Sequence, residues 1–337
     1  MTKDPLVSIV IPTHNEGAWV ERTVSATLTH DDGFPIEIIV VDDGSTDGSC
    51  DFLRRVRLAK QAARSIRQNH LGIRHARNAG AAEGRGEYLV FLDAHVEPES
   101  GWLRAMLEML SDPTVALAGC RIGDINNRST VSHRPYLFVN ESFGSGWASP
   151  ASEDGPCESP CVPGGCVAVR RATFETLGRW DVGGSKWGVD DVEFSMRAWR
   201  MGYRCLMSPA GTIWHWFRDA TERPVPAPWV EFDVNVLRCL LLHFSGRRLN
   251  AVLHGIKQRS SFAQSWHMFQ QDPNYEAWCA DMQSHFTRSE DWYFEKFSKE
   301  FEPFERRLDE LLDDKEKQQR EVNEMLRARS GASSVES

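Results

Sequence analysis

The first hundred residues alternate short apolar segments with segments in which apolar residues recur at helical spacing. The apolar segments are rich in β-branched residues and are typical of strands. The expected strands are residues 7–11, 36–41, 65–68 and 88–92, and the expected helices are residues 16–28, 47–58 and 72–83. Apolar strands that alternate with helices predict an α/β fold, with a parallel sheet covered on both faces.

Two carboxylates follow the second expected strand directly. Asp42 and Asp43 lead into Gly44-Ser45, although like charges side by side repel each other. In α/β sheets ligands bind at the carboxyl ends of the strands, so one carboxylate is expected to accept hydrogen bonds from a base or ribose. The alternative is a turn in which Asp47 caps the following helix.

A second polar cluster, Asp93-Ala94-His95, follows the strand expected at residues 88–92. In an extended segment, side chains two residues apart point the same way, so Asp93 and His95 can share one ion. A carboxylate with an imidazole suits a divalent ion such as Mn²⁺, with Zn²⁺ and Mg²⁺ as the alternatives. Diphosphate oxygens and water would complete the coordination shell. The alternative interpretation is a surface turn.

Charge and composition exclude several classes of protein. The formal net charge of −9 argues against nucleic-acid binding, because that needs a basic surface. The chain begins without a charged and apolar leader, and the apolar run at residues 234–244 is interrupted by polar residues, so we expect neither a secretory signal nor a transmembrane helix. The eight scattered cysteines match no standard zinc spacing and predict reduced thiols in a cytoplasmic protein.

The rest of the chain is less regular. Residues 120–165 are rich in Gly, Ser, Pro and Asn and predict a functional loop or lid. Regular structure is expected again at residues 164–177 and in a helix at 190–201, before a proline-containing linker at 218–228. Residues 290–329 predict an amphipathic helix or short coiled coil, which packs on the rest of the chain or on a second copy in a homo-oligomer. The polar tail, residues 330–337, is expected to be disordered.

Half of the twelve tryptophans fall within fifty residues in the middle of the chain. Flat aromatic rings stack on the apolar faces of sugars, and they also pack well in cores, so both uses stay open. The residues concerned are Trp180, Trp187, Trp199, Trp214, Trp216 and Trp229.

Four segments of the first half resemble the nucleotide-binding half of family 2 glycosyltransferases of the GT-A fold. They are residues 7–16 (VSIVIPTHNE), 41–47 (VDDGSTD), 72–80 (GIRHARNAG) and 86–93 (GEYLVFLD). The resemblance covers about residues 6–218 and implies a Rossmann-like sheet flanked by helices. The expected domains are a GT-A domain, residues 1–225, and a helical C-terminal extension, residues 226–329. Within the GT-A domain, residues 1–118 would bind the nucleotide-sugar and residues 119–225 the acceptor.

The metal motif points to one subgroup of this family. The family usually carries Asp-x-Asp where this chain has Asp-x-His, which is similar to polypeptide N-acetylgalactosaminyltransferases. Residues 163–165 (PGG), 187–190 (WGVD) and 214–218 (WHWFR) also resemble landmarks of that subgroup. The resemblance implies that His215 is the third metal ligand beside Asp93 and His95, and that Arg218 reaches the diphosphate.

The resemblance also assigns the donor contacts. Thr13, Glu16 and Asp43 would hold the uracil and ribose, Arg77 would lie near the base or diphosphate, and Asp93 would touch both ribose and metal. The full set expected at the donor is Pro12, Thr13, Glu16, Asp43, Arg77, Asp93, Ala94, Trp187 and Arg218.

The pair Asp190-Asp191 departs from the subgroup. Inverting family members carry an acidic pair here whose second carboxylate deprotonates the acceptor, whereas retaining polypeptide transferases carry Glu-Asn. Direct displacement at the anomeric carbon needs such a base. We therefore expect inversion, with Asp191 as the base and Asp190 contacting the acceptor or the donor sugar. The alternative is a pair of N-terminal helix charges, which can hold at the same time.

These features predict transfer of a hexose or N-acetylhexosamine from a UDP-sugar to a glycan, peptide or small-molecule acceptor, for example in a bacterial surface-glycan or glycopeptide pathway. One alternative is a retaining enzyme similar to polypeptide N-acetylgalactosaminyltransferases, and another is a nucleotide- or sugar-binding scaffold without activity. Nucleotidyl transfer and dinucleotide oxidoreduction are disfavoured, because no Gly-rich phosphate loop follows a strand.

Overall fold

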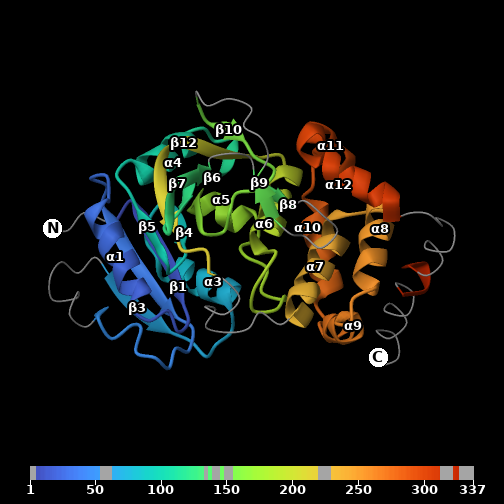
Figure 1. Ribbon diagram of the computed structural model, residues 1–337, viewed down its shortest axis with the longest axis horizontal. Coiled ribbons are helices and arrows are strands. Elements are labelled where there is room, and N and C mark those ends of the chain that lie inside the picture. The colour runs from blue at the N-terminus through green and yellow to red at the C-terminus, as the bar shows by residue number, and fades with distance from the viewer. Residues whose placement is uncertain are drawn as a thin grey trace.

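The computed structural model describes residues 5–53, 63–132, 136–138, 145–147, 155–218, 229–311 and 322–325. Within these ranges most strands gather in one large sheet on the N-terminal side, and a group of helices occupies the C-terminal side (Figure 1). The linker expected at residues 218–228 and the tail at 330–337 lie outside the described residues, except for Arg218.

The N-terminal part of the sheet is parallel, as predicted. Strand β1 (Val7–Thr13) lies between β2 (Ile36–Asp42) and β4 (Tyr88–Leu92), and β2 also pairs with β3 (Ala63–Arg67). The register places Thr13 beside Asp42, so the carboxyl ends of β1 and β2 meet at one edge of the sheet. Helices α1 (Trp19–Thr29) and α3 (Ile73–Glu83) follow β1 and β3 in the chain.

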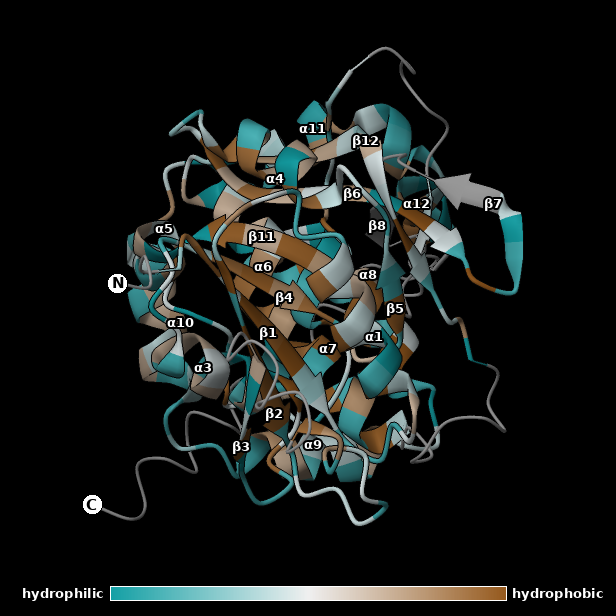
Figure 2. Cartoon of the chain, turned by 90° about the vertical axis from the view of Figure 1, so that its left-hand side faces the viewer, coloured by the Kyte–Doolittle hydropathy of each residue, from teal (hydrophilic) through white to brown (hydrophobic). Residues whose placement is uncertain are grey.

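Both faces of this sheet are buried, which explains the continuous apolar strands. Ile9 and Ile11 of β1 pack in one cluster with α1 and α4 (Trp102–Leu110), whereas Val10 packs in a second cluster on the opposite face. Because successive strand residues point to opposite faces, helices on each side cover alternate residues. Figure 2 shows β1, β4 and β11 (Cys166–Arg170) as hydrophobic strands in the interior.

The second half of the sheet is mixed. The strand order runs β10-β12-β6-β11-β4-β1-β2-β3, with β5 added to β12 and β7 to β6. Strand β12 is antiparallel to β5 and pairs His215 with Val96, which brings the end of β12 next to the residues after β4. The remaining elements of this half are β5 (Val96–Pro98), β6 (Val115–Asp124), β7 (Asn127–Ser132), β10 (Cys157–Glu158), α5 (Arg171–Thr176), α6 (Asp190–Arg200) and β12 (Arg204–His215).

Two local predictions were wrong in part. Residues 120–165 contain strands, because β6 continues to Asp124 and β7 follows, and a separate pair is formed by β8 (Tyr136–Phe138) and β9 (Ser145–Trp147). The start of the helix expected at residues 47–58 consists of turns, because the Asp47 carboxylate accepts N–H bonds from Gly17 and Ser49. Residues 54–62 lie outside the described part.

The C-terminal extension is helical, as predicted, and it shares a hydrophobic core with the sheet. Phe194 and Trp199 of α6 belong to the same buried cluster as Leu237, Tyr293 and Phe297. No described helix is long and apolar enough to cross a membrane. The helices of this part are α7 (Trp229–His243), α8 (Gly246–Lys257), α9 (Phe262–Gln270), α10 (Tyr275–Ser284), α11 (Glu290–Lys296) and α12 (Ser298–Leu311).

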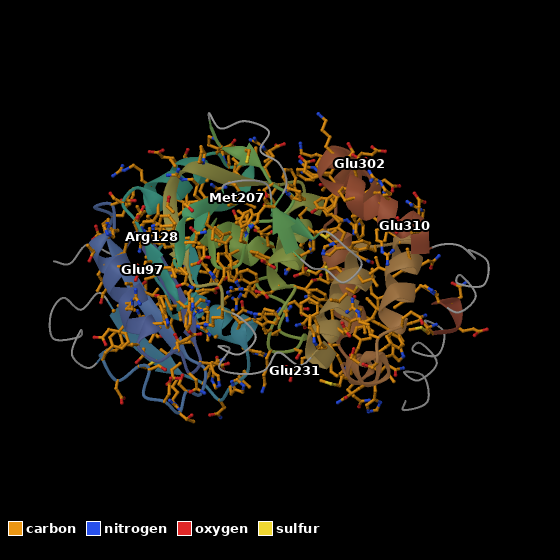
Figure 3. All side chains as sticks on the ribbon, in the orientation of Figure 1. Glu97, Arg128, Met207, Glu231, Glu302 and Glu310 are labelled. Atoms are coloured by element: carbon orange, nitrogen blue, oxygen red, sulfur yellow. The ribbon has the colours of Figure 1, made fainter. Side chains whose placement is uncertain are left out.

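The amphipathic segment expected at residues 290–329 is divided into α11 and α12 in its described part. The apolar face of α12, with Phe301, Phe304 and Leu308, is fully buried and packs on α8 of the same chain. Its charged side carries Glu302 and Glu310, which point outward in Figure 3. The apolar face that suggested a homo-oligomer is therefore covered within one chain.

Candidate active site

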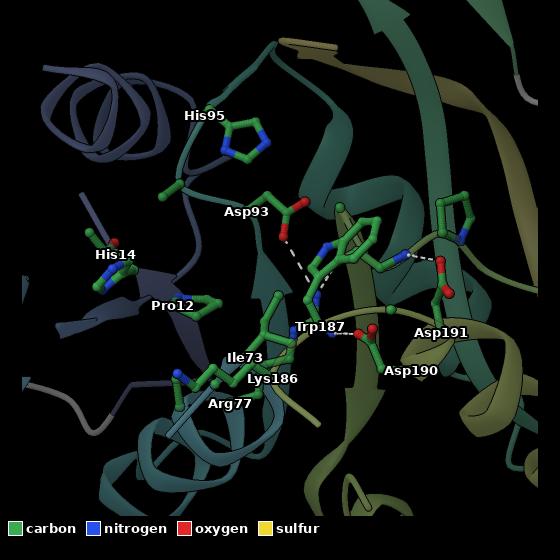
Figure 4. A pocket seen from close by; sticks show the side chains of 18 of the residues that line it. Pro12, His14, Ile73, Arg77, Asp93, His95, Lys186, Trp187, Asp190 and Asp191 are labelled. Atoms are coloured by element: carbon green, nitrogen blue, oxygen red, sulfur yellow. Dashed lines mark hydrogen bonds and ion pairs between the residues drawn. The ribbon is translucent and has the colours of Figure 1, made fainter. Parts of the chain in front are cut away.

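A cavity of about 730 Å³ opens at the carboxyl ends of β1 and β4, between the N-terminal strands and the start of α6. Its size lies in the range of small-molecule sites. Figure 4 shows Pro12 and His14 at one end, Asp190 and Asp191 at the other, and Asp93 and His95 between them. All residues predicted for the site line this cavity: Pro12, Thr13, Glu16, Asp43, Arg77, Asp93, Ala94, His95, Trp187, Asp190, Asp191, His215 and Arg218.

Asp93, His95 and His215 converge from two strands that are distant in sequence. Asp93 follows β4, His95 lies two residues on, and His215 ends β12. The backbone N–H of Trp216 donates to the carbonyl of His95, and β12 pairs with β5, which fixes the two histidines side by side. One ligand atom from each of the three residues lies within 4.8 Å of the others.

The electrostatics of this cluster favour an ionised carboxylate beside neutral imidazole. Burial raises the pKa of Asp93, but His215, His95 and Arg77 together outweigh it and lower that pKa to about 2. Burial, together with nearby His95 and Arg218, lowers the pKa of His215 despite the Asp93 carboxylate. Neutral imidazole and ionised carboxylate are the protonation states that bind a divalent cation.

The surroundings of the cluster fit a bound cation. The buried Nδ1 of His215 has no hydrogen-bond partner among the described residues, and its Nε2 lies 3.6 Å from Oδ2 of Asp93, beyond hydrogen-bonding distance. Beside this gap lies Gly165, where a Cβ atom would approach His215 Cδ2 to 3.2 Å and Asp93 Oδ2 to 3.4 Å. One oxygen and two nitrogen ligands match Mn²⁺, and these three residues could hold it.

Arg218 lies directly beside the cluster. Its guanidinium donates to the Glu16 carboxylate and to Nδ1 of His95, the latter at 2.8 Å. It also stacks over Trp216, which stacks in turn on Trp19 at 4.7 Å. Glu16 therefore contacts the metal-site residues, 3.3 Å from His95, rather than the end of the cavity where the base was expected. The segment after β12 brings Arg218 against the loop after β1, which the sequence did not indicate.

Asp43 shapes the loop before α3. Its carboxylate accepts the N–H groups of Leu71 at 2.7 Å and Gly72 at 2.9 Å, and the side-chain amide of Gln68. These bonds engage both carboxylate oxygens and hold the loop, and Asp43 also lines the cavity. The hydroxyl of Thr13, by contrast, is buried and has no partner within the described structure, which suits a polar contact with a ligand.

Two histidines at this end of the cavity were missed by the sequence reasoning. The rings of His14 and His70 stack with their centroids 3.9 Å apart, and Nδ1 of His14 lies 2.8 Å from the carbonyl oxygen of Asp43. Both rings line the cavity. His14 directly follows Thr13 in the motif of residues 7–16, so the sequence could have suggested it as a site residue. His70 carried no signal of its own, because only the Asp43 contacts bring its loop to the site.

Arg77 joins the two acidic groups of the site. It is buried, pairs with the Asp190 carboxylate, lies 3.5 Å from Asp93 and donates to the carbonyl of Gly164 at 2.8 Å. Its guanidinium also stacks over the ring of Trp180 at 4.6 Å. These partners hold Arg77 between the metal cluster and α6, so its position is set by carboxylates as well as by any ligand.

Asp190 and Asp191 open α6 but differ in environment. Asp190 is ion-paired with Arg77. Among the described residues, Asp191 accepts hydrogen bonds from backbone N–H groups alone, those of Gly164 at 3.0 Å and Val192 at 2.9 Å. Burial and the neighbouring Asp190 raise the pKa of Asp191 to about 6. A buried carboxylate with a raised pKa inside a cavity is typical of acid–base sites.

Comparison with known proteins decides the family. The sequence model of "Glycosyl transferase family 2" matches residues 8–178. The chain belongs to this family. The resemblance and the GT-A fold expected from the motifs are thus confirmed.

Two similar curated proteins come from animals. The chain is 34% identical over 239 residues to polypeptide N-acetylgalactosaminyltransferase 8 of Drosophila melanogaster, covering 65% of this chain and 39% of that protein. It is 30% identical over 246 residues to polypeptide N-acetylgalactosaminyltransferase 3 of Taeniopygia guttata, covering 66% of this chain and 39% of that protein. The chain thus spans about two fifths of the length of these relatives.

Among solved structures, the fold is similar to that of GalNAc-T7, determined with UDP, GalNAc and Mn²⁺. The TM-score is 0.75 at 21% identity, with 87% of this chain and 57% of the other covered. The family match ends at residue 178, before the acidic pair of α6, His215 and Arg218. The geometry described above, rather than the family match, places those residues in the cavity.

Proposed function

We propose that this member of family 2 is a metal-dependent glycosyltransferase that takes a hexose or N-acetylhexosamine from a UDP-sugar. The observation that carries the proposal is the convergence of Asp93, His95 and His215, with Arg218 beside them, inside a cavity that also contains a raised-pKa carboxylate. The names of the curated relatives and the ligands of the GalNAc-T7 structure support the choice of donor and metal.

The donor would lie along the cavity. Asp93, His95 and His215 would hold Mn²⁺, or Mg²⁺ in its place, and Arg218 would add positive charge for the diphosphate. The bound metal supplies Lewis-acid stabilisation to the departing diphosphate. The buried hydroxyl of Thr13 has no partner among the described residues, and Thr13 lines the cavity directly before His14, whose ring stacks on that of His70. The base is therefore expected between β1 and the loop that Asp43 holds.

Asp191 would act as the base for the acceptor. It would accept the proton of the acceptor hydroxyl while the acceptor oxygen bonds to the anomeric carbon and the bond from that carbon to the diphosphate oxygen breaks. Arg77 keeps Asp190 engaged and leaves Asp191 as the carboxylate with the raised pKa. This course inverts the anomeric configuration. The retaining course stays the alternative, because Asp-x-His and Trp-Gly resemble the polypeptide transferases.

For the acceptor we infer a peptide or glycan. The relatives are named as polypeptide transferases, and the cavity mouth exposes aromatic rings, with Trp187 48% and Phe217 51% exposed. Such rings stack on sugar faces and on peptide side chains.

Three further expectations from the sequence stay proposals. They are the division into a GT-A domain at residues 1–225, with its two halves, and an extension at 226–329, a cytoplasmic location, and a bacterial pathway.

Titration calorimetry with UDP, with and without MnCl₂, tests the donor and metal proposal. We expect binding that depends on Mn²⁺, is lost with EDTA, and is strongly weakened by His215→Ala but unchanged by His267→Ala, an exposed histidine on α9. Binding that ignores the metal would refute the assignment of the metal site. The stereochemical course is read from the product of an α-linked donor by NMR, where an α-linked product would refute inversion.

A further inference from the structure

The loop of residues 181–189 lies between α5 and α6, and residues 186–189 line the cavity. Trp187 in this loop faces the cavity, and the loop delivers the acidic pair Asp190-Asp191 (Figure 4). The loop has no helix or strand of its own. It ends at Val189, a β-branched residue in the left-handed region with φ 63°. A conformation that is disfavoured for valine must be held by the surroundings.

The N-terminal half of α7 covers this loop. Phe232, Asn235 and Arg238 are spaced three residues apart and therefore lie along one side of the helix. Each approaches a different glycine of the loop. A Cβ atom at Gly188 would lie 2.5 Å from the ring of Phe232, and Cβ atoms at Gly184 and Gly183 would lie closer than 3.0 Å to Asn235 and Arg238.

These close approaches show why the loop carries glycines at three positions. The space that a side chain would need is occupied by the side chains of α7. Gly183 and Gly184 do not have positive φ angles, so their need for glycine is steric. The loop and the helix therefore fit each other specifically, although the family match stops before both of them.

Hydrogen bonds reinforce the steric fit. The buried Asn235 accepts the N–H of Ser185 at 2.7 Å and donates its amide to the carbonyl of Trp187 at 2.7 Å. Glu231, which lies between the sheet part and the helical extension in Figure 3, accepts the Ser185 hydroxyl at 2.7 Å. The guanidinium of Arg238 donates two hydrogen bonds, of 2.7 and 2.8 Å, to the carboxylate of Asp181 at the start of the loop.

The opposite side of the loop is held by the nucleotide half. Arg74 of α3 donates to the carbonyl of Ser185 at 2.8 Å and to that of Gly188 at 2.6 Å. The loop is thus clamped between α3 and α7. Since Asn235 alone among the named α7 side chains bonds the Trp187 backbone, its amide fixes the part of the loop nearest to the cavity.

We propose that α7 is part of the active site and that Asn235 is a positioning residue for Trp187 and the Asp190-Asp191 pair. The inference rests on the proposed function. Glu231 and Phe232 at the start of the helix also line the cavity, so the same helix forms a wall on the acceptor side. The C-terminal extension is then required for turnover as well as for stability, because a small displacement of a reacting group lowers the rate strongly.

The test compares Asn235→Ala with Asp233→Ala. Asp233 is equally buried on the same helix but bonds Arg259 and Ser261, away from the loop. The assays are calorimetry of UDP with MnCl₂, release of UDP by hydrolysis of UDP-Gal, UDP-Glc, UDP-GalNAc and UDP-GlcNAc, and thermal unfolding. For Asn235→Ala we expect kcat of hydrolysis to fall roughly 10- to 100-fold, while Kd for UDP changes by less than about twofold.

Asp233→Ala is expected to lower the melting temperature and to keep kcat when assayed well below that temperature. Asn235→Asp gives a second variant. It keeps an acceptor for Ser185 but sets a carboxylate oxygen against the carbonyl of Trp187, so kcat is expected to fall as in Asn235→Ala. Equal kcat in Asn235→Ala and wild type would overturn the inference, as would a parallel loss of UDP affinity and kcat. A wild type without metal-dependent UDP binding or hydrolysis would instead refute the proposed function and, with it, this inference.

Discussion

Replacement of Asp191 by asparagine should inactivate the protein and stabilise it. The folded-state pKa of Asp191, about 6, is raised above the ordinary 3.8 by burial and by Asp190. A raised carboxyl pKa means that the fold accommodates the protonated form better than the ionised form. The stability that Asp191 contributes is therefore complete below pH 3.8, is lost as the pH rises through about 6, and stays lost at neutral pH.

The size of the effect follows from this interval. The pKa of Asp191 rises from 3.8 to about 6 on folding, and each pKa unit corresponds to about 1.4 kcal/mol. The ionised carboxylate therefore lowers the free energy of unfolding by at most about 3 kcal/mol. Asparagine removes this cost but has one acceptor oxygen, so it loses either the bond from Gly164 or that from Val192. One such bond contributes about 1 kcal/mol. The variant should therefore be more stable by about 2 kcal/mol near pH 7.5 and about equal to wild type near pH 4.5.

Urea unfolding followed by tryptophan fluorescence at the two pH values measures this difference, because the other titrating groups are common to both proteins. Asp190→Asn is the matched control. It removes the charge partner of buried Arg77 and should destabilise the protein at neutral pH. In hydrolysis assays Asp191→Asn should lower kcat by roughly 10²-fold or more with UDP binding retained. A stability difference that does not change between the two pH values would refute the reasoning about Asp191.

Three further changes probe the site and its support. Gly165→Ala would place a methyl group 3.2 Å from the imidazole and 3.4 Å from the carboxylate of the metal cluster, and calorimetry should show Mn²⁺-dependent UDP binding weakened by roughly tenfold. Trp19→Ala removes the ring stacked on Trp216, which should weaken the same binding by about 2- to 10-fold, whereas Trp19→Phe should keep most of it. Arg197→Met leaves buried Glu193 without its charge partner, and denaturant unfolding should show a loss of about 3–5 kcal/mol.

The N-terminal half was predictable because its pattern is local. Strands buried on both faces are continuous in apolar residues, and their carboxyl ends fall at Asp42 and directly before Asp93. The spacing of Asp93 and His95 could be interpreted as a ligand pair without the fold. His215 came from the resemblance, since nothing in the sequence shows that β12 pairs with β5 and places it next to His95.

The remaining site contacts join segments that are far apart in sequence. Glu16 meets Arg218 across about two hundred residues, and Arg77 meets Asp190 across about a hundred. Glu16, Arg77 and Arg218 were assigned to the donor by resemblance, and Asp190 to the acceptor or the donor sugar. The protein partner of each side chain depends on which strand ends are neighbours in the sheet. The periodicity and composition of the sequence do not show which strands are neighbours in the sheet. The sequence of α7 likewise predicts only a buried helix, and its contact with the glycines of the loop at residues 181–189 becomes visible in the structure.

The metal cluster resembles that of one subgroup and the acidic pair that of the inverting members, and the structure shows how both fit in one site. Gly164 bonds Asp191 through its N–H and Arg77 through its carbonyl, while the adjacent Gly165 borders the metal ligands. A two-glycine segment therefore separates Asp191, the proposed base, from Asp93 and His215. Because Arg77 contacts carboxylates on both sides of this segment, a change at the metal cluster will reach the acidic pair through Arg77. The stereochemical course is then a property of this connected unit, and replacing the acidic pair alone, without Arg77, is not expected to convert it.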